Sequence, residues 1–276
     1  MNSVSLLISS LRFDIQLCTV RRWNWRQKLE FIFKKYYVLV KHAIKPFTLG
    51  NDFVYLSGRR FFYASSYGLT RYQSIICNWD ALMRAHIPTI KTAVDVGANI
   101  GSFSRLIRIN YPDCDIFAIE PIEELCAVIK KNFANDKGVH VYSTALSEQE
   151  GTARMMYKEM HNEFGFIDAH GNIPITTQTL DGFVKKNSIS AIDLLKIDVE
   201  SLEESVLKGA TEALAITHYL IIECTIINNN HYTISSLLSR LYAPSFNFQI
   251  VGLVNYKDMG KTLFCIDLMM KNTMIV

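Results

Sequence analysis

Two hydrophobic patterns divide this chain, and the change between them lies near Thr92. Before that point, residues 24–44 repeat apolar side chains at spacings of three and four, which predicts an amphipathic helix. Two short apolar runs then flank the turn residues Ser57-Gly58 and predict a β-hairpin. Helical periodicity over Arg71–His86, closed by Pro88, predicts a second helix.

From Thr92 onward, apolar runs typical of buried strands alternate with helical segments. Strands are predicted at Ala93–Val96, Asp115–Ile119, Val139–Tyr142, Ile192–Ile197, Tyr219–Ile222, Gln249–Val254 and Thr262–Met270. Helices are predicted at Ser102–Asn110, Glu123–Asn132, Gly182–Lys186, Leu202–Leu214 and Thr233–Tyr242. This alternation predicts parallel βαβ units in an α/β fold. Only a short turn separates the last two strands, so we expect them to form an antiparallel terminal hairpin in a seven-stranded sheet.

Composition agrees with a folded chain, since 49% of the 276 residues are hydrophobic and 20% are charged. These values exclude a disordered or collagen-like protein. We divide the chain into a basic, aromatic helical segment (1–50), a hairpin and helix leading into the core (51–90), and an α/β domain (91–276).

The net charge of +3 is unevenly distributed. Residues 1–50 contain nine Lys and Arg but two acidic residues, a surplus of seven, so the remainder carries a net charge of −4. With Trp23 and Trp25, the basic helix at 24–44 has the composition of a helix that makes a peripheral contact with a membrane surface. Alternatively, its apolar stripe packs on the rest of the protein; the stripe comprises Leu29, Ile32, Phe33, Tyr36, Val40 and Ala43.

The sequence contains no stretch of about 20 consecutive, predominantly apolar residues, so we expect neither a membrane-spanning segment nor a secretory signal. Its six cysteines form no CxxC pair, so we expect buried, reduced thiols and a cytoplasmic protein, with peripheral contact at the inner face of the membrane as an option.

The strongest chemical signal is the segment Val94–Gly101, in which a strand enters a turn with glycines at 97 and 101 and then a helix. The helix N-terminus after Gly101 suits a carboxylate or phosphate. Asp95, directly before the turn, can accept an ammonium group, and Asn99 lies inside the turn. A cofactor that carries an amino-acid group would fit this loop, because its carboxylate could bind the helix N-terminus and its ammonium group could bind Asp95.

Nineteen residues after Gly101, the next predicted strand ends at Glu120-Pro121. An acidic side chain at this position can accept hydrogen bonds from both hydroxyls of a ribose. Together, the loop and Glu120 predict a site for S-adenosyl-L-methionine. Its adenine is expected near Ser143–Leu146, which includes Ala145.

A set of motifs in this order resembles the FkbM-type methyltransferases over roughly residues 90–270. It comprises Val94–Gly101, Ile119-Glu120-Pro121, Thr179-Leu180-Asp181, Leu195–Glu200, Val206–Ala210, Ile221-Ile222-Glu223 and Ile266–Met269. The resemblance implies a class I methyltransferase (Rossmann-like) fold, S-adenosyl-L-methionine as methyl donor and, usually, O-methylation. Acceptors in that family include sugars of surface glycans and hydroxyls of natural products, which implies a small-molecule or glycan acceptor and a role in polysaccharide biosynthesis.

One position departs from the family, which often has Gly where this chain has Ser201. A Gly there would give the backbone room to turn. We expect Ser201 instead to cap the following helix, with Glu204 completing a capping box.

Acidic residues end two neighbouring predicted strands, where open α/β sheets bind ligands. Asp198 is our candidate general base, with Lys196 orienting it and Glu200 beside it. The alternative is a divalent metal held by Asp198 and Glu223, because hard cations prefer oxygen ligands.

The irregular insert Gly151–Thr179 either forms a lid with acceptor contacts or an exposed hairpin; its candidate contact residues are His161, His170, Tyr157, Phe164 and Phe166.

Two other functions stay open. Nucleic-acid methylation is prompted by the basic segment, but acidic residues on the acceptor side disfavour it. An inactive, membrane-docked scaffold would retain the fold without turnover.

Overall fold

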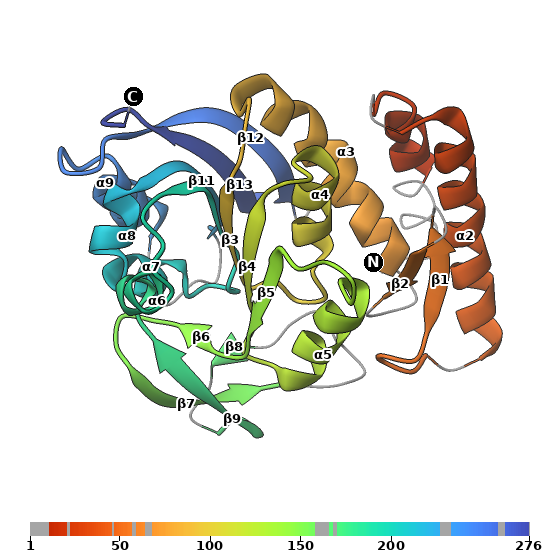
Figure 1. Cartoon of the computed structure of the whole chain (residues 1–276), viewed down its shortest axis with the longest axis horizontal. Coiled ribbons are helices and arrows are strands. Elements are labelled where there is room, and N and C mark those ends of the chain that lie inside the picture. The colour runs from red at the N-terminus through yellow and green to blue at the C-terminus, as the bar shows by residue number, and fades with distance from the viewer. Residues whose placement is uncertain are drawn as a thin grey trace.

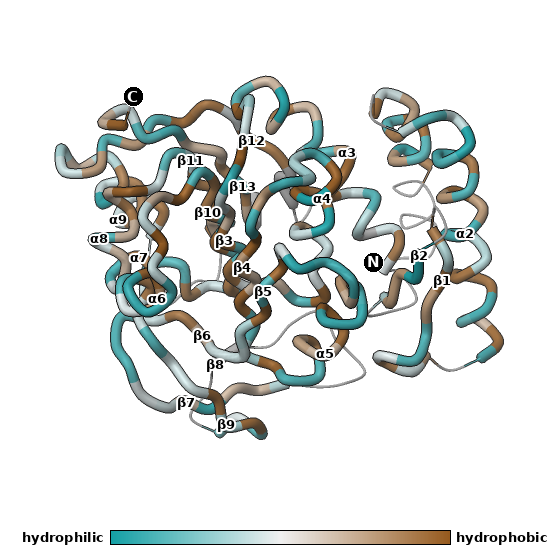
Figure 2. The backbone as a smooth tube through the Cα atoms, viewed as in Figure 1, coloured by the Kyte–Doolittle hydropathy of each residue, from teal (hydrophilic) through white to brown (hydrophobic). Residues whose placement is uncertain are grey.

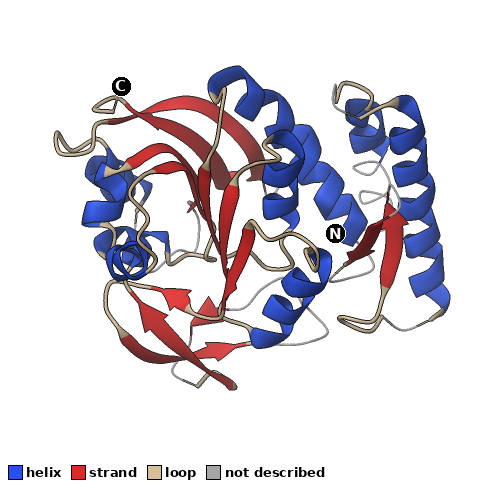
Figure 3. Cartoon of the chain, in the orientation of Figure 1, coloured by secondary structure: helices blue, strands red, loops and turns tan. Residues whose placement is uncertain are grey.

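A seven-stranded sheet forms the centre of the molecule, with helices on both of its faces (Figures 1 and 3). The computed structural model describes residues 11–20, 23–45, 47–56, 59–63, 68–157, 166–167, 170–226, 233–258 and 263–275. The strand order is β12-β13-β11-β10-β3-β4-β5. Their bounds are β3 (Thr92–Val96), β4 (Asp115–Ile119), β5 (Val139–Tyr142), β10 (Ile192–Ile197), β11 (Thr217–Thr225), β12 (Phe248–Asp258) and β13 (Leu263–Asn272).

The pairing of these strands confirms the predicted fold class. Strands β5, β4, β3, β10 and β11 run parallel, whereas β13 pairs antiparallel with β11 and β12 pairs antiparallel with β13. The chain starts in the middle of the sheet at β3, extends to β5, and then continues on the other side at β10. Loops at the carboxyl ends of β3 and β10 therefore meet at a topological switch point, where doubly wound sheets bind ligands.

Helices on the two faces of the sheet bury separate hydrophobic cores. One face carries α3 (Gly68–His86), α4 (Ser102–Asn110) and α5 (Glu123–Asn132). The other carries α6 (Leu180–Lys186), α7 (Glu203–Lys208), α8 (Thr211–Ala215) and α9 (Ile234–Leu241). The central strands are strongly hydrophobic in Figure 2, as expected for parallel strands that are covered on both faces.

The helix predicted over Leu202–Leu214 is in fact two helices, α7 and α8, which are interrupted at Gly209-Ala210. A Cβ atom at Gly209 would lie 2.3 Å from the carbonyl oxygen of Ser147, so this glycine lets a distant loop approach the helix end. A tertiary contact, which periodicity cannot reveal, explains the interruption.

The insert after β5 is more regular than the sequence predicted. It forms a second sheet in the order β6-β9-β7-β8, with β6 (Ala145–Leu146), β7 (Gly151–Met156), β8 (Phe166–Ile167) and β9 (Ile173–Gln178). Strands β7 and β9 pair antiparallel over five residues each. This small sheet lies beside the carboxyl end of the central sheet, at the bottom of Figure 1.

The N-terminal part adds a helical segment at 11–17, α2 (Trp25–Ile44) and a hairpin of β1 (Phe53–Leu56) and β2 (Arg59–Phe62). A capping box between Asn24 and Gln27 begins α2, which confirms the predicted helix. None of the helices in the described ranges is long and apolar enough to cross a membrane.

The packing face of α2 differs from the expected one. Phe31, Lys35 and Val38 are its buried residues, whereas Phe33 and Val40 of the predicted stripe are 72% and 62% exposed. Lys35 interrupts the buried face with a charge, so a count of apolar positions selects the wrong side of the helix.

Lys35 is buried because a carboxylate and an amide surround its ammonium group. Its Nζ lies 2.5 Å from Asp14 Oδ1 and donates to Gln73 Oε1 at 3.0 Å. Tyr36 donates to the other oxygen of Asp14 at 2.8 Å. Burial lowers the pKa of Lys35, and the hydrogen bond and charge of Asp14 oppose that effect. The network joins segment 11–17, α2 and α3.

We expect Asp14→Asn to lower the free energy of unfolding by about 2 kcal/mol, because the buried Lys35 ammonium loses its ionic partner. Urea unfolding followed by circular dichroism measures the change. Asp52→Asn is the matched control, since Asp52 pairs with the more exposed Lys41 and its loss should cost about 1 kcal/mol or less. Equal losses in the two variants would contradict a special role for the buried pair.

Candidate active site

A cavity of about 280 Å³ opens at the carboxyl ends of the central strands. It is lined by the loops that follow β3, β4 and β10, by residues of β11 and β13, by α3 and α4, and by the insert. Residues predicted to act in different parts of the reaction therefore face one space; those lining it are Gly97, Asn99, Glu120, Ala145, Lys196, Asp198, Glu200 and Glu223.

The glycine loop forms a tight turn between β3 and α4. Gly97, Asn99 and Gly101 have φ values of 77°, 53° and 79°, all in the left-handed region. The backbone N–H groups of Gly97 and Ala98 both donate to the carbonyl oxygen of Ile119, which fixes the loop on β4. Gly101 is the N-cap of α4 and gives no side-chain cap, so the first turn of α4 depends on other acceptors for its N–H groups.

Gly97 is required by a contact within the protein. A Cβ atom at this position would lie 1.9 Å from the carbonyl oxygen of Asp198. The amide of Asp198 in turn donates to the carbonyl oxygen of Val96 at 3.1 Å. The two loops that line the cavity from β3 and β10 are thus packed backbone against backbone.

Glu120 is 5% exposed and presents its carboxylate beside the glycine loop. Its two oxygens accept hydrogen bonds from the backbone amides of Asn99 at 2.9 Å and Ile122 at 3.1 Å. Burial raises the pKa of Glu120 to about 7, although both amides and the charge of Lys196 act in the opposite direction. This carboxyl group therefore titrates near neutral pH.

Lys196 forms ion pairs with two of the predicted acidic residues, Asp95 and Asp198. It lies on β10 opposite Asp95 on the neighbouring strand β3. Its Nζ is 3.5 Å from Asp95 Oδ1 and 3.2 Å from Asp198 Oδ2. Burial alone would lower the pKa of Lys196, but the two carboxylates outweigh it and hold the pKa above its usual value. Lys196 consequently stays charged at neutral pH.

Asp95 lies beneath the cavity, with no exposed surface, and does not belong to its lining. Its Oδ2 accepts a hydrogen bond from Ser104 at 2.6 Å, and its Oδ1 faces Lys196. The predicted contact between Asp95 and a ligand's ammonium group would require one of these partners to move.

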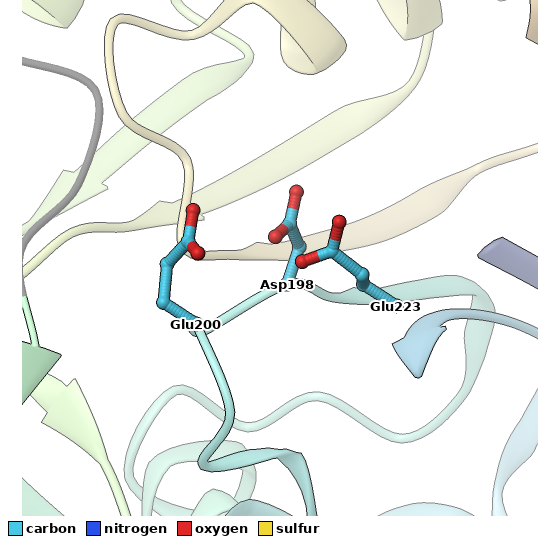
Figure 4. A group of neighbouring side chains, drawn as sticks. All are labelled: Asp198, Glu200 and Glu223. Carbon is cyan, nitrogen blue, oxygen red and sulfur yellow. The ribbon is translucent and has the colours of Figure 1, made fainter. Parts of the chain in front are cut away.

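Three carboxylates gather where the loop after β10 meets β11, and they point toward one another (Figure 4). Asp198 and Glu200 come from the loop after β10, and Glu223 comes from β11. One oxygen from each lies within 4.8 Å of the others. The set offers only oxygen atoms, so the divalent ion it would suit is a hard cation such as Mg²⁺ or Ca²⁺. The same oxygens can accept hydrogen bonds from the hydroxyl groups of an acceptor.

Glu203 holds the loop that carries two of these carboxylates. Its fully buried carboxylate accepts hydrogen bonds from the amides of Val199 and Ser201 at 3.1 and 3.2 Å. The predicted capping box from Ser201 to Glu204 is wrong, because α7 has Leu202 as its N-cap and no side-chain cap. Ser201 instead has a φ of 78°, the conformation that glycine adopts most easily.

Comparison with known proteins shows the family to which this chain belongs. The sequence profile of the methyltransferase FkbM domain matches residues 95–248, which is more than half of the chain. The chain belongs to the FkbM methyltransferase family. The predicted resemblance is thereby confirmed.

Individual FkbM relatives are distant. Methyltransferase sdnD of Sordaria araneosa is 29% identical over 164 residues, which cover 46% of this chain and 63% of that protein. The 31-O-demethyl-FK506 methyltransferase FkbM of Streptomyces tacrolimicus is 27% identical over 153 residues, which cover 43% and 59%. The chain thus spans less than two thirds of these relatives' length. The solved methyltransferase FkbM of Methylobacillus flagellatus KT has a TM-score of 0.43 at 18% identity, and the match covers 65% of this chain and 43% of that one.

Two aromatic side chains of this FkbM-family site were not predicted. Trp79 on α3 and Phe103 on α4 line the cavity and pack edge to face, with ring centroids 6.1 Å apart. Lys196 Nζ lies 5.6 Å from the centre of the Phe103 ring. In the sequence, Trp79 looks like any core residue of an amphipathic helix, and only the packing of α3 on α4 brings it to the site.

The insert contributes one predicted acceptor contact to the cavity. Tyr157 is buried and lines it, whereas His170 is exposed in a turn. His161 and Phe164 lie outside the described residues, and only the backbone of Phe166, in β8, is described.

Proposed function

We propose that this protein transfers the methyl group of S-adenosyl-L-methionine to a hydroxyl of a saccharide or natural product. The observation that carries this proposal is a single cavity with two chemically different sides. By side we mean a set of lining residues of one chemistry: the glycine loop and the buried Glu120 form the first, and Lys196, Asp198, Glu200 and Glu223 form the second. One side suits an amino-acid nucleoside, and the other suits a group that must lose a proton.

The residues on the first side fit the methyl donor. The Glu120 carboxylate has acceptor capacity for the two ribose hydroxyls in addition to its amide partners. Thr144, Ala145 and Leu146 line the neighbouring wall, where the adenine is expected. The first turn of α4, at Ser102, offers backbone N–H groups to the donor's carboxylate.

S-adenosyl-L-methionine supplies an activated methyl carbon when bound, so the protein's main task is to position the acceptor in line with it. We assign Asp198 as the general base. Its carboxylate takes the proton of the acceptor hydroxyl while the hydroxyl oxygen bonds to the methyl carbon and the carbon–sulfur bond breaks toward sulfur. Lys196 positions Asp198 through the ion pair at 3.2 Å.

The nature of the acceptor follows from the second side of the cavity. Carboxylates favour ligands rich in hydroxyl donors and repel phosphates, which favours polyhydroxyl acceptors over nucleic acid. The Streptomyces tacrolimicus relative is named as a methyltransferase of 31-O-demethyl-FK506, a name that refers to a methyl group on an oxygen atom. Mass spectrometry of glycans and small molecules from cells with and without the gene would identify the acceptor.

Calorimetric titration with S-adenosylhomocysteine, the reaction's other product, tests the donor site directly. We expect it to bind, and Glu120→Ala to weaken it by at least tenfold, since a charged hydrogen-bond partner is lost. Absence of binding by the intact protein, or unchanged binding in Glu120→Ala, would contradict the proposal.

The affinity for S-adenosylhomocysteine is expected to rise about tenfold between pH 6 and pH 8. The reason is that only ionised Glu120 accepts both ribose hydroxyls, and its pKa is raised to about 7. The unliganded protein should lose stability as pH rises from about 4.5 to 7, because its folded state holds a proton that the unfolded chain releases. Glu120→Gln is the control and should bind weakly with no pH dependence; a retained pH slope in this variant would assign the titration to another group.

A further inference from the structure

The outer face of α2 exposes a continuous apolar stripe, which we call the outer stripe. It consists of Trp25, Leu29, Phe33, Tyr37, Val40 and Ile44, with exposed fractions between 44% and 84%. In Figure 1, α2 lies at the outer edge of the molecule, on the side of the N-terminal hairpin that is remote from the central sheet. Apolar patches of this extent on a soluble protein usually mark an interaction surface.

The spacing shows that these six residues form one face. They follow one another at intervals of four, four, four, three and four, which places them within an arc of about 120° at 3.6 residues per turn. The buried residues Phe31 and Val38 lie about opposite. The inner face of α2 is thus already packed, and the outer stripe is a second, independent apolar face.

The positive charge of the segment that carries the outer stripe indicates which kind of surface binds it. Residues 11–45 contain nine Lys and Arg against two acidic residues. When the ion pairs of Lys35 with Asp14 and of Lys41 with Asp52 are set aside, seven basic residues stand against Glu30. The guanidinium of Arg26 lies over the Trp25 ring at 5.5 Å, at the start of the stripe. A second copy of the chain would bring the same positive surplus against this face, whereas an anionic lipid surface complements it.

The shape and residue types of the outer stripe also match a lipid surface. A straight helix face is convex and linear, so it can lie in the plane of the headgroups with its apolar side chains inserted. Trp25 and Tyr37 carry an apolar ring with a polar tip, a combination typical of membrane interfaces. We propose that the outer stripe docks this protein peripherally on an anionic membrane.

Co-sedimentation of the full chain with vesicles tests this inference. The vesicles are phosphatidylcholine alone, or phosphatidylcholine with about 30% phosphatidylserine to supply an anionic surface. The chain should sediment with the anionic vesicles and much less with the neutral ones. The double variant Phe33→Gln and Val40→Gln should reduce binding by about tenfold or more, because two inserted apolar side chains are lost.

The matched control is the double variant Tyr242→Gln and Leu253→Gln, which removes two apolar side chains that are 45% and 53% exposed elsewhere on the surface. It should sediment like the unmodified chain. Trp25→Gln with Ile44→Gln provides a second test at the two ends of the stripe. Binding of S-adenosylhomocysteine should be unchanged in every variant, which separates this inference from the proposed methyl transfer.

Three results would overturn the inference. The first is that the unmodified chain fails to sediment with anionic vesicles. The second is that the outer-stripe variants sediment as well as the control variant. The third is that the outer stripe forms a protein–protein interface. In the last case, analytical ultracentrifugation would show a dimer that the Phe33→Gln and Val40→Gln variant dissociates.

Discussion

Asp198→Asn is expected to lower kcat for methyl transfer by about 10²–10⁴-fold, the range for loss of a general base. The substitution keeps the size of the side chain and removes its ability to accept a proton. The Asp198 amide still donates to the Val96 carbonyl oxygen, so the loop should keep its path. Affinity for S-adenosylhomocysteine should therefore change little, and single-turnover assays with a radiolabelled methyl donor would isolate the loss to the chemical step.

The metal alternative predicts a different pattern. If Asp198, Glu200 and Glu223 held a divalent cation, Glu223→Gln would lose as much activity as Asp198→Asn, and a chelator would abolish turnover. We expect a smaller loss in Glu223→Gln and no effect of chelation, because the Lys196 ammonium already provides Asp198 with a cationic partner at 3.2 Å. Activity restored only by added Mg²⁺ or Mn²⁺ would contradict the assignment of Asp198 as the base.

The site could be predicted from sequence where the fold alone determines proximity. The carboxyl ends of parallel strands meet at one edge of a sheet, so residues at or near the carboxyl ends of β3, β4, β10 and β11 converge whatever separates them in the chain. This is why Gly97, Glu120, Asp198 and Glu223 could be assigned to one site before any contact was known.

Sequence patterns failed where a tertiary contact overrides local periodicity. Lys35 resembles a solvated residue, and only its contacts with Asp14 and Gln73 explain why it lies on the buried face of α2. Gly209 resembles a tolerated glycine inside a helix, and only the approach of Ser147 explains the break there. Trp79 likewise joins the cavity through the packing of α3, an element that carries no motif.

Gly97→Ala is expected to destabilise the protein by about 4 kcal/mol and to abolish binding of S-adenosylhomocysteine. A φ of 77° costs a non-glycine residue about 1–3 kcal/mol. The added Cβ also collides with the Asp198 carbonyl oxygen at 1.9 Å, and overpacking of this kind costs about 1–3 kcal/mol or more. Relief of the collision must separate the loops after β3 and β10, which carry the donor-binding and catalytic sides of the cavity.

Gly50→Ala separates the backbone strain from the steric clash, because it places alanine at a similar positive φ without a clash. Gly50 has a φ of 72°, but its Cβ would meet only Lys131 Nζ, at 3.4 Å, and the Val128 side chain, at 3.8 Å. We expect it to cost about 1–2 kcal/mol in urea unfolding and to leave ligand affinity unchanged. If the two variants lost equal stability, strain alone would account for Gly97, and the backbone contact with Asp198 would not be what joins the two sides of the site.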